Sequence, residues 1–169
     1  MNRFKFCAFV LLFAVAGCYA PPNPPAKATG TTTAIRYATF ERFTENDFKR
    51  ISEYFTDREN QGGNLILRTN SKKRAGAYLT IGLETGARVP AGTTIELFYC
   101  VPAKSGYFQQ TWKTERDFVA LPEREILLGV TDRGNALPNA WRFVITAPDG
   151  TIIAARSSFL WGEYNGIKN

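Results

Sequence analysis

The chain has 169 residues, and its 21 Lys and Arg against 15 Asp and Glu give a formal net charge of +6 at pH 7. It contains no histidine, which excludes a Ser-His-Asp triad and every zinc site with a histidine ligand. The tight basic cluster at residues 72–74 comes without a recognisable nucleic-acid-binding motif. It therefore predicts a solvated turn rather than an anion-binding site, and we expect no nucleic acid as a partner.

The first 17 residues have the pattern of a secretory signal peptide. Arg3 and Lys5 precede an apolar stretch of eleven residues, 6–16, which ends in small side chains. A membrane-spanning helix needs about 20 apolar residues, so this stretch is too short for a stable transmembrane anchor. The alternative is an N-terminal core helix. We expect residues 1–17 to be removed on export.

The tetrapeptide Val15-Ala16-Gly17-Cys18 resembles the lipobox of bacterial lipoproteins, an aliphatic residue and two small residues before an obligatory cysteine. The resemblance implies cleavage between Gly17 and Cys18 and attachment of lipid to Cys18. The commonest lipobox has leucine where this chain has Val15, which is a mild departure. A conventional cleavage after Ala20, three residues further on, would place Pro21 directly after the cut, where its ring hinders the peptidase.

Residues 18–34 are interpreted as the lipidated cysteine and a tether rich in proline and threonine. Its prolines favour extended polyproline II, at about 3.1 Å per residue, so the tether could reach roughly 50 Å from the lipid surface. The alternative is a loop packed on the domain. Two or more acyl chains hold a protein stably on a membrane. Tyr19, rather than an aspartate, follows the cysteine, and in the enterobacterial pattern this implies the outer membrane, facing the periplasm or the cell surface.

Residues 35–169 have the length of a single domain, and alternating apolar and polar residues predict that it is all-β. Residues 77–83 and 93–101 alternate most clearly, and Pro148-Asp149-Gly150 predicts a hairpin turn. We expect about eight strands, at residues 32–43, 64–69, 77–83, 93–101, 107–113, 125–131, 141–146 and 151–161. The spacing resembles that of an immunoglobulin-like β-sandwich by pattern only, without the Cys…Trp…Cys spacing of antibody domains.

A helix is expected near residues 45–56. Phe48, Ile51 and Phe55 recur at helical spacing, and Thr44 stands where it could cap the first turn. Gly62 and its neighbour would end the helical segment. The alternative is a strand through residues 49–55.

Cys100 is expected to be a free thiol packed as a small hydrophobe. Cys7 leaves with the signal peptide and Cys18 would carry lipid, so no cysteine remains to pair with Cys100. Its neighbours in the sequence are apolar. A thiol nucleophile would usually need a base such as histidine, and the chain has none.

An enzyme is not expected. Glu115, Asp117, Glu123 and Glu125 lie close in the sequence, and a pair of carboxylates could act on glycosides. They alternate with arginines, however, which is typical of a solvated loop. No phosphate-binding loop, metal-ligand spacing or cofactor motif is present. We expect no cofactor and no metal.

A carbohydrate-binding surface is the alternative function. Tyr107, Gln109 and Trp112 offer aromatic rings and an amide that could stack on a sugar and bond its hydroxyls. The competing interpretation places these aromatics in the core. The first hypothesis is therefore a non-catalytic interaction or structural module of the cell envelope with a protein partner. Glycan binding is second, and a glycoside-acting enzyme is third.

Overall fold

The computed structural model describes residues 33–102, 107–132 and 136–161. The signal peptide, the lipobox with Cys18 and the tether up to residue 32 lie outside the described residues. No helix in the described part of the chain is long and apolar enough to cross a membrane.

The described residues are mostly β, with ten strands in three sheets and two short helices. The elements in chain order are β1 (Ile35–Phe43), α1 (Glu45–Phe48), α2 (Glu53–Thr56), β2 (Leu65–Arg68), β3 (Gly76–Leu83), β4 (Arg88–Val89), β5 (Thr94–Cys100), β6 (Phe108–Lys113), β7 (Phe118–Val119), β8 (Ile126–Val130), β9 (Ala140–Thr146) and β10 (Ile152–Ser157).

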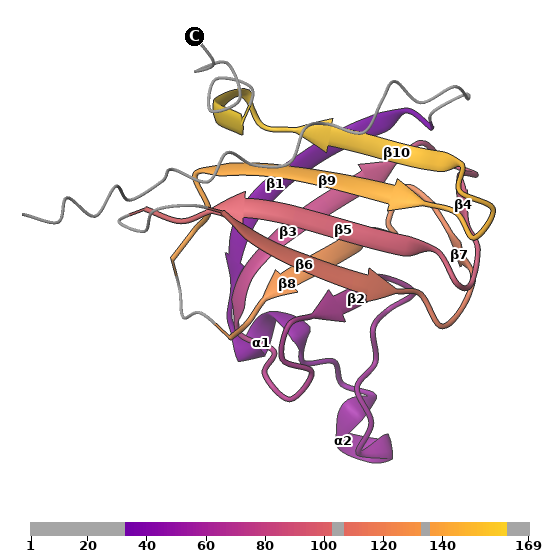
Figure 1. Ribbon diagram of the computed structural model, residues 1–169. Coiled ribbons are helices and arrows are strands. Elements are labelled where there is room, and N and C mark those ends of the chain that lie inside the picture. Colours follow the sequence, from indigo (N-terminus) through magenta and orange to yellow (C-terminus); the bar gives the residue numbers. More distant parts are fainter. Residues whose placement is uncertain (1–32, 103–106, 133–135, 162–169) are drawn as a thin grey trace, which may run out of the picture.

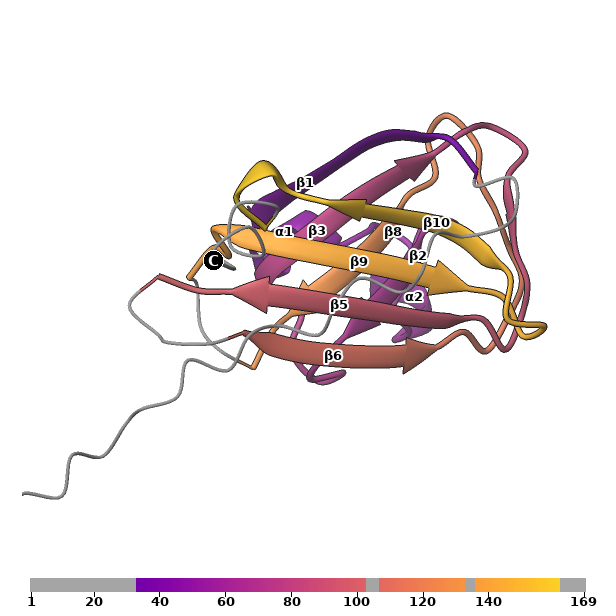
Figure 2. The ribbon, with the colours of Figure 1, turned by 45° about the horizontal axis from the view of Figure 1, so that its top comes forward.

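Two four-stranded sheets face each other (Figures 1 and 2). The first sheet has the order β1-β3-β8-β2, in which β1, β3 and β8 are antiparallel and β2 runs parallel to β8. The second sheet, β10-β9-β5-β6, is antiparallel throughout. The edge strands β2 and β6 therefore lie on the same side of the molecule, as the ribbon shows (Figure 1).

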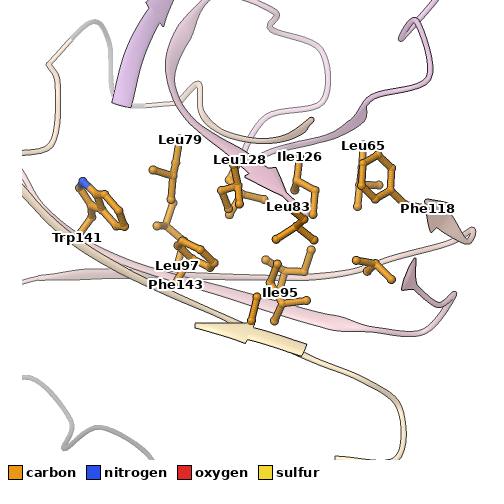
Figure 3. Packing of buried hydrophobic residues seen from close by; sticks show 14 of the residues in the cluster. Leu65, Leu79, Leu83, Ile95, Leu97, Phe118, Ile126, Leu128, Trp141 and Phe143 are labelled. Carbon is orange, nitrogen blue, oxygen red and sulfur yellow. The ribbon is translucent and has the colours of Figure 1, made fainter. Parts of the chain in front are cut away.

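The core lies between the two sheets, and it confirms the predicted alternation of residues 77–83 and 93–101. Leu79, Ile81 and Leu83 of β3 belong to the same buried cluster as Ile95 and Leu97 of β5, and each is at most 1% exposed. Figure 3 shows Leu79 and Leu128 of the first sheet opposite Leu97 and Phe143 of the second. Burial of these side chains, at about 25 cal/mol per Å² of apolar surface, is the main stabilising contribution to the fold.

The strand predictions were wrong in two places. The third sheet consists of the two-residue strands β4 and β7, which are too short to give a visible alternation. The last predicted strand, 151–161, ends at Ser157, because residues 159–161 turn into helix. That turn places Trp161, which is 2% exposed, in a separate cluster with Phe98, Cys100 and Ala140. Since Leu97 and Tyr99 face the core, this cluster lies on the outer face of the second sheet.

The predicted single helix at 45–56 was wrong in its continuity. Thr44 does precede the first turn, and its backbone N–H and hydroxyl donate to the Asp47 carboxylate at 2.6 and 2.8 Å. Helix α1 then stops after Phe48, because Lys49 has an extended backbone (φ −71°, ψ 126°). A second turn, α2, begins at Glu53.

Two glycines let tyrosine rings lie flat on the outer face of the first sheet. Gly82 is paired with Tyr37, and Gly129 is paired with Tyr78. A Cβ atom at either glycine would collide with the ring of its partner. The ring of Tyr78 thereby lies across β8, and this position decides how the segment between β1 and β2 is held.

Candidate interaction surface

Residues 44–63, here called the arm, connect β1 to β2 and stand outside the first sheet. In Figure 1, α1 lies against the end of that sheet and α2 projects beyond it. The arm is held at its base by apolar contacts and along its length by ion pairs.

The base of the arm is an aromatic cluster. Phe48, which is 7% exposed, packs against Phe43 and Tyr78 with ring centroids 5.3 and 5.0 Å away. The guanidinium carbon of Arg68 lies 4.8 Å from the centroid of the Phe48 ring. A cation over an aromatic face is attracted by the ring quadrupole, so the same arginine covers the cluster and stabilises it.

A network of charged side chains ties the arm to the first sheet. Arg68 donates to both carboxylate oxygens of Glu59, at 2.8 and 2.6 Å, and also to the Tyr78 hydroxyl, at 2.7 Å. Arg74 forms an ion pair with Glu53 at 2.7 Å. The Tyr78 hydroxyl in turn donates to the backbone carbonyl of Arg74 at 2.6 Å. The Arg68 side chain is 6% exposed, so its pair with Glu59 is largely shielded from water.

These bonds also shift the titration of the two carboxyl groups. Hydrogen bonds from Arg68 hold the pKa of Glu59 below its ordinary value, and the bond from Arg74 lowers the pKa of Glu53 in the same way. Both groups are therefore charged at neutral pH, when they hold the arm in place.

The outer part of the arm exposes large apolar side chains. Ile51, Tyr54 and Phe55 are 79%, 79% and 83% exposed, and these three residues are here called the tip. Helix α2 buries none of its residues. Clustered exposed apolar side chains on a folded domain are typical of an interaction site. The tip is thus the feature of the arm that the fold itself does not use.

An open pocket of about 760 Å³ lies beside the arm. Its walls are the arm, the edge strand β2 and the turn that follows β6. Arg58, Lys113 and Arg116 bring positive charge to it. Arg116 donates to the Gln61 side chain at 2.6 Å and to the Asn64 carbonyl at 3.2 Å, which joins the two walls.

The structure does not bring the three predicted glycan-site residues together. Gln109 points outward and donates to Glu96 at 3.1 Å, and Tyr107 packs against Phe98 in the outer cluster of the second sheet. Trp112 points to the opposite face, where it packs on the main core and donates to the Arg68 carbonyl at 3.2 Å. Tyr107 and Trp112 therefore cannot form one stacking platform.

The four acidic residues considered for catalysis have separate surroundings. Asp117 accepts a hydrogen bond from the Ala91 backbone at 2.7 Å, and Glu125 accepts one from the Tyr37 hydroxyl. Glu115 lines the pocket, and Glu123 is exposed. Within residues 33–102, 107–132 and 136–161, no three His, Cys, Asp or Glu side chains gather where they could hold a metal ion.

Two further predictions can be compared with the structure. Cys100 is buried, as expected, and burial raises the pKa of its thiol. The basic cluster at 72–74 is only partly a solvated turn. Lys72 and Lys73 are exposed, but Arg74 turns back to pair with Glu53.

The sequence offered a misleading signal for the tip. Ile51 and Phe55 share a helical spacing with Phe48, which predicts one buried face, but only Phe48 is buried among these three. Tyr54 gave no signal of its own. Spacing identifies an apolar face without saying whether the chain covers it, so the tip could not be separated from the core by pattern.

Comparison with known proteins gives no relative from which a role could be transferred. No protein-family model matches the chain, and neither the curated proteins nor the solved structures contain a match.

Proposed function

We propose that this protein is an exported lipoprotein whose β-rich domain is a non-catalytic interaction module of the cell envelope. In this proposal Cys18 carries the lipid, and the tip binds a protein partner. The observation that carries the proposal is the exposure of Ile51, Tyr54 and Phe55 on an arm that ion pairs fix to the sheet. Apolar side chains on a segment that is already held in place suit a binding surface, since less backbone entropy is lost when a partner covers them.

The position of the arm supports a partner remote from the anchoring lipid. The described chain starts at Thr33, whose N–H donates to the Ile153 carbonyl of β10 at 2.7 Å. Strand β1 then runs for nine residues, or about 30 Å, before the arm begins. The tip therefore lies at the far end of β1 from the point where the tether would join the domain (Figure 1).

We further infer an immunoglobulin-like sandwich with one altered edge. The inference is supported by β1, β3 and β8 in one sheet and β5, β6, β9 and β10 in the other, an order compatible with that fold. The edge position beside β8 is taken by β2, which follows β1 in the chain and runs parallel to β8. The insertion of β2 there is also what carries the arm out of the sandwich.

Site-specific photocrosslinking in the native envelope tests the partner. A benzoyl-phenylalanine at position 55 should give a discrete crosslinked protein, whereas the same probe at Phe159 should not. Phe159 is a matched control because it is 80% exposed, against 83% for Phe55. The product at position 55 should disappear when Tyr54→Ser is added, since that change removes apolar surface without touching the ion pairs. Identical products at both positions, or none at 55, would contradict the proposal.

The lipid anchor is tested separately. A palmitate analogue should label the wild-type chain in the cells that make it and leave Cys18→Ala unlabelled and uncleaved, because the thiol is the attachment atom. Equal labelling of both proteins would show that Cys18 is not acylated. The anchor could fail this test while the tip still binds its partner.

A further inference from the structure

The edge strand β2 leaves backbone hydrogen-bonding groups open to the pocket. Leu65 and Thr69 donate their N–H groups to the carbonyl of Glu125, which directly precedes β8, and to that of Gly129 in β8, each at 2.9 Å. The backbone groups of successive strand residues point alternately to the two sides of a strand. Those of Ile66 and Arg68 therefore point away from β8, toward the open edge.

Both ends of this edge are already capped by side chains. The Arg68 carbonyl accepts the indole N–H of Trp112 at 3.2 Å, and the Asn64 carbonyl accepts a bond from Arg116 at 3.2 Å. Between the two caps, the N–H and C=O of Ile66 face the pocket, and no group in the described part of the chain bonds to them on that side. One residue of an added strand could pair with both groups.

The charges around this edge favour an anion. Arg58, Lys113 and Arg116 line the pocket, and no carboxylate of the described residues lies within ion-pairing distance of any of the three. Of the two acidic residues in the lining, Glu59 is paired with Arg68, so Glu115 is the one lining carboxylate left to set against these three cations. Arg116 donates only through one of its terminal nitrogens, so the rest of its guanidinium fork is open to a carboxylate.

We propose that this pocket binds a short extended peptide segment that carries a carboxylate. The backbone of the segment pairs with Ile66 as an added strand, and its carboxylate binds Arg116 with support from Lys113. The caps at Asn64 and Arg68 limit the paired length to about three residues, because the edge between them spans roughly 13 Å. The carboxylate could be a chain terminus or an acidic side chain. This site is separate from the tip and depends neither on the tip nor on the lipid.

Fluorescence anisotropy with the full chain in detergent tests the site, with four valine-threonine tetrapeptides as probes, each labelled at its N-terminus with an uncharged BODIPY dye. One has a free C-terminal carboxylate. A second is C-terminally amidated and ends in aspartate. A third is amidated and uncharged, and the fourth is the first with its central amide N-methylated. At least one of the two acidic probes should bind, and whichever binds identifies the source of the carboxylate. The uncharged and the N-methylated probes should bind at least tenfold more weakly.

Protein variants locate the binding. Arg116→Gln should weaken the binding of the acidic probe at least tenfold. Lys113→Gln should weaken this binding severalfold, and it leaves in place the hydrogen bonds that Arg116 makes to Gln61 and Asn64.

Two variants are controls and should leave the affinity for the acidic probe unchanged. One is Arg156→Gln, at an exposed position of β10 on the opposite edge of the second sheet, and the other is Tyr54→Ser at the tip. The proposal is overturned if no probe binds at 1 mM, if the uncharged or N-methylated probe binds as well as the acidic one, or if Lys113→Gln and Arg156→Gln have equal effects.

Discussion

The sheet core and the arm are stabilised in opposite ways. All eight residues of β3 are buried, and its inward side chains meet those of β5 and β9 in a cluster of hydrophobic side chains without a charged residue. In the arm, Phe48 is buried at the base, while Arg68, Arg74 and their carboxylate partners fix the remainder. Because the tip side chains are exposed and make no such contacts, we expect that the domain does not need them for folding. They are consequently available for binding.

The largest expected effect comes from the core. Leu97→Ala should lower the free energy of unfolding by about 3–5 kcal/mol, because a fully buried side chain is replaced by a cavity. Phe55→Ala, in the tip, should change it by less than about 0.5 kcal/mol, as for exposed positions in general. Urea denaturation followed by tryptophan fluorescence measures both changes. A similar loss in the two variants would mean that the tip belongs to the folding core.

The arm should depend most on Arg68. Arg68→Ala should cost about 3 kcal/mol, since it leaves Glu59 without its main partner and uncovers the Phe48 ring. Hydrogen exchange should become faster in residues 44–63 and stay slow in β3 and β5. The exposed Arg88→Ala is the control. Uniformly faster exchange across the sheets would show that the arm and the core unfold as one unit.

Substitution of Gly129 or Gly82 in the first sheet should have an effect on stability of intermediate size. Gly129→Ala should cost about 1–3 kcal/mol, because the ring of fully buried Tyr78 has no space into which it can retreat. Gly82→Ala should cost less, since Tyr37 is only partly buried and can turn toward solvent. Thermal denaturation of the two variants should rank them in this order. A larger loss of stability for Gly82→Ala than for Gly129→Ala would mean that the ring of Tyr37, and not that of Tyr78, is the one that cannot move.

The smallest expected effect is a pH dependence of the arm. The folded state lowers the pKa of Glu59, so its contribution to stability is complete above its ordinary pKa of 4.5 and is lost as the pH falls through the lower, folded value. The stability difference between wild type and Glu59→Gln should therefore be larger at pH 7 than at pH 3. Urea denaturation at the two pH values measures it, and an unchanged difference would show that the Glu59 charge does not hold the arm.

Sequence by itself determined the β character of the domain and much of its core. Alternation in residues 77–83 and 93–101 grouped Leu79 with Ile81, and Leu97 with Ile95, on one face of each strand, because successive side chains of a strand point to opposite faces; the structure places both groups in the main core. The apolar surroundings of Cys100 also predicted its burial correctly. These properties can be read locally, because they depend on whether apolar residues recur at every second position of a short stretch of sequence.

Tertiary structure alone decided the order of the strands and the nature of the arm. The sequence does not say that β2 pairs with β8, because strand pairing depends on contacts between residues far apart in the chain. It also does not say that Arg68 pairs with Glu59 or that the Trp112 indole donates to the backbone of β2. Nor does it say that Ile51 stays exposed. An apolar side chain looks the same in the sequence whether it meets a neighbouring strand or solvent. Only the positions of the distant elements separate the two outcomes.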